Sequence, residues 1–208
     1  MVDSQIRTWE VLDQRVLDTV LRVQREAFAP SQYASLAFVD MEIPLGHGEV
    51  MLAPKLEARM LQELTLKDTD RVLEVGTGSG YMTALLAALS GHVYSVDLYE
   101  DFAQSAREKL AALDVSNVTI ETGDAHRGWT GHAPYDAILL TGSVPLLPPE
   151  FKTQLRVGGR LLAVIGEPPI MTAILYTCVA EGVLNEVGLF ETSIAPLRNL
   201  IRPDRFVF

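Results

Sequence analysis

Residues 71–81 read Arg-Val-Leu-Glu-Val-Gly-Thr-Gly-Ser-Gly-Tyr, and the fold expected of the whole chain follows from this stretch. A short apolar run ends in an acid, glycines follow at three alternate positions, and residues 82–89 then read as a helix. Strand, tight turn and helix start in this order carry an adenine nucleotide in doubly wound sheets. A structural turn without a ligand is the alternative, because a glycine-rich turn on its own is a weak signal.

Two residues indicate which nucleotide such a turn would bind. A dinucleotide fingerprint, Gly-x-Gly-x-x-Gly, places its last glycine where this chain has Tyr81. Glu74 precedes the first glycine by two residues. A carboxylate there is unfavourable beside a pyrophosphate but suits a ligand that carries cationic amino and sulfonium groups. The stretch therefore predicts binding of S-adenosyl-L-methionine.

The composition predicts one soluble domain with a sizeable core. The 208 residues are 48% apolar and carry a formal net charge of −10. This acidity disfavours nucleic acid and anionic membranes as partners. The single cysteine, Cys178, excludes an intramolecular disulfide, and the histidines show no metal-ligand spacing, so we expect no metal. Because neither a membrane-spanning segment nor a signal peptide is recognisable, we expect a cytoplasmic location.

The first 66 residues predict a helical segment in front of the sheet. Apolar residues three to five positions apart over 9–26 indicate an amphipathic helix, and Pro30 stops its continuation. Residues 31–48 read as extended or looped. A second helix is expected over 52–66, with Pro54 near its first turn.

From residue 67 onward, strands alternate with helices across short links, which predicts a parallel sheet with right-handed crossovers. Two strands after residue 168 predict an antiparallel pair at the sheet edge. The expected fold class is α/β: a doubly wound, Rossmann-like sheet of seven strands with an N-terminal helical extension, in one domain of residues 1–208 (1–66 and 67–208). The strands are expected at 71–75, 92–97, 118–121, 135–140, 160–165, 170–179 and 183–194, with helices at about 81–90 and 99–113 and a short helix before 155.

Ligands bind such sheets at the carboxyl ends of the strands. Asp97 ends the second strand, where an acid accepts both ribose hydroxyls, and Asp124 after the third strand is placed to accept from the adenine amino group, with the backbone N–H of Ala125 beside it. Taken singly, each acid could equally be a solvated or capping carboxylate. The expected cofactor-binding set is Glu74, Gly76, Thr77, Gly78, Gly80, Asp97, Leu98, Asp124, Ala125 and Thr141.

These motifs resemble those of the protein-L-isoaspartate O-methyltransferases, a family of class I S-adenosylmethionine-dependent methyltransferases. In the N-terminal half the resemblance lies in residues 25–30, Tyr33 and residues 43–48, which end in Gly46-His47-Gly48. The other matching stretches are 72–81, Gly123-Asp124, 134–138, 154–161 and, more loosely, 195–197. The resemblance covers nearly the whole chain.

The chain departs from the family pattern directly after residue 48. The family typically carries Gln-Thr-Ile-Ser-Gln-Pro there, with the serine in the active site, whereas residues 49–54 of this chain read Glu-Val-Met-Leu-Ala-Pro. Leu52 takes the position of the serine and has no hydroxyl to orient a carboxylate. Glu49 adds negative charge near an anionic acceptor. The catalytic positions implied are Leu52 and, at the end of the fourth strand, Thr141 and Ser143. Thr141, Ser143 or backbone N–H groups of residues 46–53 could replace the missing donor.

The resemblance implies methyl transfer from the sulfonium to the α-carboxylate of an isoaspartyl residue, as in protein repair, by an enzyme that we expect to be a monomer. A carboxylate with a reference pKa near ~4 is already ionised at neutral pH, so no general base is needed. Two alternatives remain at this point. One is a methyltransferase for a different, small-molecule acceptor, and the other is a non-catalytic protein that binds S-adenosyl-L-methionine.

Overall fold

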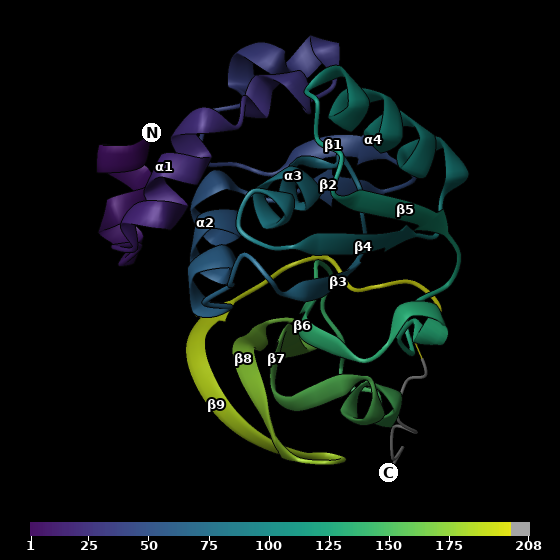
Figure 1. The fold of residues 1–208 in the computed structure, drawn as a ribbon. Coiled ribbons are helices and arrows are strands. Elements are labelled where there is room, and N and C mark those ends of the chain that lie inside the picture. Colours follow the sequence, from purple (N-terminus) through teal and green to yellow (C-terminus); the bar gives the residue numbers. More distant parts are fainter. Residues whose placement is uncertain (201–208) are drawn as a thin grey trace, which may run out of the picture.

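The computed structural model describes residues 1–200 and has one large sheet of seven strands in the order β5-β4-β3-β6-β7-β8-β9. The chain enters the sheet at its centre with β3, moves outward to β5, and then returns to the other side of β3 with β6 (Figure 1). The strands are β3 (Arg71–Val75), β4 (His92–Asp97), β5 (Val118–Thr122), β6 (Tyr135–Leu140), β7 (Leu155–Glu167), β8 (Ile170–Ala180) and β9 (Val183–Thr192). The reversal of strand order between β3 and β6 creates the crevice in which such sheets bind ligands.

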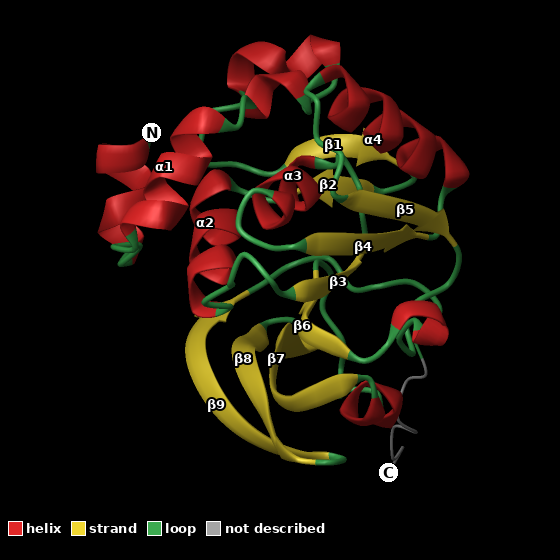
Figure 2. Ribbon diagram, viewed as in Figure 1, coloured by secondary structure: helices red, strands yellow, loops and turns green. Residues whose placement is uncertain are grey.

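The pairing confirms the predicted α/β class. Strands β3 to β7 pair in parallel, and β8 and β9 continue the sheet in antiparallel fashion from β7. The central strands β3 and β6 are almost fully buried because both faces of the sheet are covered there, whereas the edge strand β5 is mostly half-buried. The long β8 and β9 curve away from the helical part of the molecule (Figure 2).

Four α-helices accompany the sheet within the described residues: α1 (Gln14–Arg22), α2 (Pro54–Glu63), α3 (Tyr81–Ala87) and α4 (Glu100–Ala112). Only short turns stand where helices would precede β6 and β7, namely Thr130–His132 and Pro149–Thr153. The remaining turns are Val2–Ile6, Arg7–Trp9, Arg25–Ala27 and Ser31–Leu36. Within this part of the chain no helix combines the length and apolar character needed to cross a membrane.

The N-terminal segment differs from the prediction in three places. The helix expected over 9–26 begins only at Gln14, because Glu10 has a positive φ of 59° and Asp13 caps the helix by accepting from the next backbone N–H groups. The helix expected over 52–66 is shorter at both ends. Residues 31–48 are not simply looped, since they hold a helical turn and the first strand of a hairpin, β1 (Ile43–Gly46) paired with β2 (Glu49–Met51).

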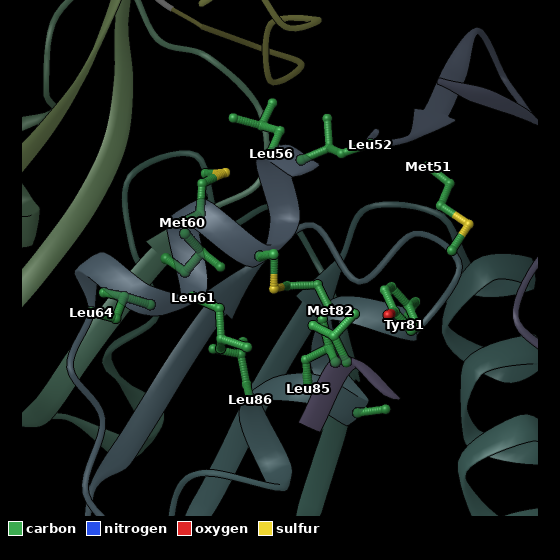
Figure 3. Close-up of a cluster of buried hydrophobic side chains, with 14 of the residues drawn as sticks. Met51, Leu52, Leu56, Met60, Leu61, Leu64, Tyr81, Met82, Leu85 and Leu86 are labelled. Atoms are coloured by element: carbon green, nitrogen blue, oxygen red, sulfur yellow. The ribbon is translucent and has the colours of Figure 1, made fainter. Parts of the chain in front are cut away.

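One buried apolar cluster joins the N-terminal segment to the sheet, extending from Ile6 to Ile194. Figure 3 shows its central part, where side chains of α2 interdigitate with side chains of α3. Fully burying one leucine side chain stabilises a fold by roughly 1.5–3 kcal/mol. Leu52, which lies beside Leu56 in this cluster, is 6% exposed. The packing therefore holds the segment after β2 against the sheet.

A buried ion pair supports the same segment from behind. Arg25 is fully buried and pairs with the carboxylate of Glu57 on α2. Its Nε donates to the backbone oxygen of Ala37 at 2.7 Å and its Nη2 to that of Leu52 at 2.6 Å. The guanidinium also lies 4.8 Å from the ring centroid of Tyr81 at the start of α3. Arg25 thus connects three parts of the chain that are distant in sequence.

Candidate active site

A pocket opens where β3, β4, β5 and β6 end, next to the reversal in strand order. It encloses about 930 Å³, including space open to solvent, which falls in the size range of small-molecule sites, roughly 300–1,000 Å³. Of the residues predicted from sequence, those that line it are Leu52, Gly76, Thr77, Gly78, Asp97, Leu98, Asp124, Ala125 and Thr141. Glu74, Gly80 and Ser143 do not line it.

The glycine turn adopts backbone conformations that require glycine. Gly76 and Gly78 have φ values of 97° and 51°, a region that residues with a side chain rarely adopt. A Cβ atom on Gly76 would lie 2.2 Å from Oγ1 of Thr141, which itself donates to the backbone oxygens of Val75 and Gly76. The turn therefore packs directly on the end of β6 and leaves its backbone open to the pocket.

Gly76→Ala is expected to weaken cofactor binding at least about tenfold, because the new methyl group pushes the turn away from Thr141 and strains a positive φ, each a cost of about 1–3 kcal/mol. Calorimetric titration with S-adenosylhomocysteine measures the change. Gly188→Ala is the control, since its Cβ would meet nothing closer than 3.6 Å. Equal affinity of the two variants would show that the turn does not need glycine at residue 76.

Asp97 holds the turn from the neighbouring strand. It is 5% exposed, its Oδ2 accepts from the N–H of Gly78 at 2.7 Å, and its Oδ1 accepts from the N–H of Tyr99 at 2.9 Å. Burial raises the pKa of this carboxyl despite these hydrogen bonds. Each carboxylate oxygen keeps a further lone pair, so Asp97 can anchor the turn and still accept from two hydroxyl groups in the pocket.

Glu74 lies under the glycine turn and outside the pocket. It is fully buried, and its Oε2 accepts from the hydroxyls of Thr83 at 2.5 Å and Ser95 at 2.6 Å. Burial raises its pKa to about 8. Its Oε1 has no partner among the described residues. Glu74 thus joins β3 to α3 and β4 without lining the pocket, and its predicted contact with cationic ligand groups stays a prediction.

Glu74→Gln is expected to flatten the dependence of stability on pH. The pKa of Glu74 is about 8 in the folded protein against 4.5 ordinarily, so between these values the folded state keeps a proton that the unfolded chain releases. The contribution is fully present below the unfolded pKa and is lost as pH rises, by up to about 1.4 kcal/mol per pH unit.

Urea unfolding of both proteins between about pH 5 and pH 8 measures this difference. Glu108→Gln on the exposed side of α4 is the control. If wild type and Glu74→Gln lost stability in parallel as pH rises, Glu74 would not be the titrating group.

Gly80 and Ser143 have packing roles. A Cβ on Gly80 would lie 2.9 Å from Cβ of Ala106, so this glycine lets α3 approach α4. Ser143 is buried, and its hydroxyl donates to the backbone oxygen of Ile194 at 3.1 Å. Neither residue reaches the pocket, because the residues next to them in sequence, Ser79 and Gly142, form the lining instead.

Asp124 lies at the pocket edge and binds two side chains. Its Oδ1 contacts Nδ1 of His126 at 2.6 Å, and its Oδ2 accepts from the side-chain amide of Asn199 at 2.7 Å. Burial raises the pKa of this carboxyl, but the hydrogen bonds from Asn199 and His126 together outweigh burial and hold the pKa below its ordinary value. Because Asn199 belongs to the segment after β9, Asp124 ties that segment to the strand ends.

Several lining residues were not predicted from the sequence. One of them is Tyr99, on which His47 at the hairpin tip stacks with ring centroids 4.1 Å apart; Nε2 of His47 lies 2.9 Å from Oδ2 of Asp101. Tyr99 and Phe102 follow Asp97 closely, so their place after a strand end could have indicated them. Arg198 could not have been found, since its partner Glu49 is 149 positions away. The lining residues not predicted include Val50, Met51, Glu57, Ser79, Met82, Tyr99, Phe102, His126, Leu197 and Arg198. Among residues 1–200 no group of three or more His, Cys, Asp or Glu is arranged to hold a metal ion.

Comparisons with known proteins agree with this geometry. The sequence model of the family described as Protein-L-isoaspartate(D-aspartate) O-methyltransferase (PCMT) matches residues 1–181. A protein-L-isoaspartate O-methyltransferase of Methanoculleus marisnigri is 41% identical over 197 residues, which are 95% of this chain and 89% of that protein. Another, from Syntrophus aciditrophicus, is 39% identical over 183 residues, 88% of this chain and 84% of that one.

The fold is also found among solved structures. A Plasmodium falciparum structure described as a protein-L-isoaspartate O-methyltransferase in complex with S-adenosyl-L-homocysteine superimposes with a TM-score of 0.80. The match covers 93% of this chain and 94% of that chain at 22% identity. At this identity the comparison supports the fold, and the sequence matches above carry the family assignment.

Proposed function

Because this chain belongs to the protein-L-isoaspartate(D-aspartate) O-methyltransferase family, we propose that it transfers a methyl group from S-adenosyl-L-methionine to the α-carboxylate of isoaspartyl residues in damaged proteins. The observation that carries the proposal is the family match over residues 1–181, on a chain whose glycine turn and strand-end acids line one pocket. The proposed activity is the one that the names of these relatives state, and its role would be the repair of damaged proteins.

The residues present fit S-adenosyl-L-methionine. The glycine turn presents backbone without side chains, so that a ligand can approach closely. Asp97 would accept from the ribose hydroxyls, and Asp124 with Ala125 would bind the adenine, as they stand at successive strand ends of the pocket. When bound, S-adenosyl-L-methionine would supply a methyl group on a cationic sulfur, which could pass to an acceptor oxygen while the sulfur kept the electron pair of the broken C–S bond.

The chain's own contribution is binding and orientation. A carboxylate acceptor is ionised at neutral pH, so no side chain has to remove a proton from it. Holding two reactants in line can contribute roughly 7–11 kcal/mol. Val50, Met51, Leu52 and Met82 give part of the pocket an apolar wall, and in such surroundings a carboxylate is attracted to a nearby cation more strongly than in water.

The proposed function is tested by initial rates with labelled S-adenosyl-L-methionine and two peptides that differ only in one isoaspartyl or aspartyl residue. We expect turnover of the isoaspartyl peptide and none of the aspartyl peptide. Labelling of neither peptide would contradict the proposed substrate.

A different acceptor is favoured by one observation, the apolar side chain of Leu52 in place of the family's serine. Leu52 lines the pocket and cannot donate a hydrogen bond to a carboxylate. An apolar small-molecule acceptor would suit this wall better. The same label, offered with a panel of small hydroxyl and carboxyl compounds, would identify such an acceptor.

Leu52→Ser is expected to raise kcat/KM for an isoaspartyl peptide by about tenfold or more, because a hydroxyl donor to a charged acceptor typically contributes about 1.5–3 kcal/mol. Leu56→Ser is the matched control: Leu56 is equally buried in the same cluster but does not line the pocket. Both variants lose apolar burial, but only Leu52→Ser places a hydroxyl in the pocket, so only this variant should gain activity. Equal rates for wild type and Leu52→Ser would mean that another group already supplies the donor.

We further propose that residues 1–66 and 67–208 act as one domain, that the protein works as a monomer in the cytoplasm, and that it needs neither nucleic acid nor a membrane. The shared apolar cluster of the N-terminal segment and the sheet supports the single domain within the described residues, and residues 201–208 lie outside them. The net charge of −10 supports the absence of polyanionic partners, which bind basic surfaces.

A further inference from the structure

None of the three side chains predicted to stand beside the methyl acceptor, Leu52, Thr141 and Ser143, offers a free hydroxyl hydrogen to the pocket. Leu52 has none. The hydroxyl hydrogen of Thr141 is shared between the backbone oxygens of Val75 and Gly76, at 2.9 and 2.8 Å. That of Ser143 is directed to Ile194 and away from the pocket. The charge of an acceptor carboxylate therefore calls for a binding group other than these three side chains.

The charges around the pocket point to one side chain. The lining contains the carboxylates of Glu49, Glu57, Asp97 and Asp124, and within the described residues its only lysine or arginine is Arg198. The charge of Glu57 is already compensated by Arg25 behind the wall. This excess of negative charge in the lining disfavours an anionic acceptor, and a cationic side chain that faces the acceptor would add to the attraction of the cationic cofactor.

Arg198 is held in place from two sides. Its Nε donates to Oε1 of Glu49 at 2.5 Å, and its Nη2 donates to the backbone oxygen of His47 at 3.0 Å. Its Nη1 has no partner among residues 1–200, and its side chain is 49% exposed against 23% for Glu49. The guanidinium therefore has donors to spare at the mouth of the pocket.

The backbone that carries Arg198 is fixed as well. Residues 195–199, which we name the C-terminal strap, cross the middle of the sheet after β9 (Figure 1). Ser143 donates its backbone N–H to Ala195 and accepts from that of Leu197, both at 2.9 Å, and Asn199 binds Asp124. The strap thus sets Arg198 between the hairpin tip and the strand ends.

We propose that Arg198 binds the carboxylate of the methyl acceptor and that Glu49 is its internal counter-ion, held until the acceptor arrives. This inference rests on the proposed function and names the residue that recognises the substrate's charge. A planar guanidinium presents parallel N–H donors to a carboxylate. One acceptor oxygen would accept from Arg198, and the other would face the methyl group; the carboxylate becomes a methyl ester and no proton moves.

The roles of the two residues predict opposite effects on substrate binding. Arg198→Gln removes the cation and should raise KM for an isoaspartyl peptide by about tenfold or more, because hydrogen bonds to charged groups are the strong ones. Glu49→Gln releases the guanidinium and should lower KM about threefold. Arg198→Lys keeps the charge without the paired donors, and its KM should lie between those of wild type and Arg198→Gln.

Three comparisons isolate the effect. In the double variant Arg198→Gln with Glu49→Gln, the benefit of Glu49→Gln should disappear, because the two residues act as a unit. The affinity for S-adenosylhomocysteine should change less than twofold in every variant. Arg156→Gln is the matched control, since Arg156 forms an ion pair with Asp136 of similar exposure, 44% and 21%, away from the pocket.

The outcomes separate this inference from the proposed function. If the ion pair only fastened the strap to the hairpin, Arg198→Gln and Glu49→Gln would change KM in the same direction, and the inference would be overturned while the wild-type activity stood. KM unchanged in Arg198→Gln would overturn it too. If the wild type neither methylated nor bound isoaspartyl peptide in the presence of S-adenosylhomocysteine, the proposed function would fail, and the assignment of Arg198 with it.

Discussion

Replacing Arg25 with methionine is expected to lower the free energy of unfolding by about 3–5 kcal/mol, the typical cost of removing one partner of a buried ion pair. The change leaves the carboxylate of Glu57 buried and unpaired, with an exposed fraction of 3%. It also removes the donors to the backbone oxygens of Ala37 and Leu52. Native domains are stable by only about 5–15 kcal/mol, so a large share of the stability depends on this arginine.

The midpoint of urea unfolding measures the loss. The informative control is the double variant Arg25→Met with Glu57→Leu, because replacing both members of a buried pair with apolar residues is often nearly neutral. We expect the double variant to recover most of the stability that Arg25→Met loses. If it were no more stable than the single variant, the cost would come from the lost backbone hydrogen bonds and not from the unpaired charge.

Replacing Asp97 with alanine is expected to lower the affinity for S-adenosyl-L-methionine about 5- to 100-fold. The ribose hydroxyls would lose their acceptors, and buried polar groups without partners cost about 1–3 kcal/mol each. The backbone N–H groups of Gly78 and Tyr99 would lose theirs as well. The glycine turn would then be less ordered before the ligand arrives.

Calorimetry on the purified variant tests this prediction. Glu108→Ala on the exposed side of α4 is the control, because it removes a carboxylate that does not line the pocket. Unchanged affinity in Asp97→Ala would remove this carboxylate from the cofactor site. If Asp97→Ala lowered the free energy of unfolding by as much as the free energy of binding, the role of Asp97 would be to hold the glycine turn alone.

The architecture could be predicted from sequence because its signals are local. The central parallel strands β3 and β6 are short runs of mostly apolar residues, and the glycine turn after residue 75 follows the first strand of the sheet. The confirmed α/β fold and family follow from these runs and motifs. The hairpin at residues 43–51 was not predicted, since its strands have four and three residues and show no clear alternation.

The site was harder to predict because a sequence does not say where a side chain points. Glu74 stands in a strand buried on both faces, so no alternation of polar and apolar residues reveals that it turns away from the pocket. Gly80 belongs to the glycine pattern but serves helix packing. Glu49 and Arg198 meet only after the chain has completed the sheet, which is a tertiary contact without a local signal.

The central claim is that this pocket methylates the carboxylate of an isoaspartyl residue. The most direct measurement is tandem mass spectrometry of an isoaspartyl peptide after incubation with the wild-type protein and labelled S-adenosyl-L-methionine. We predict one labelled methyl group per peptide, located on the α-carboxyl of the isoaspartyl residue as a methyl ester. A methyl group at any other atom, or an unlabelled peptide under conditions in which the cofactor is bound, would contradict the claim.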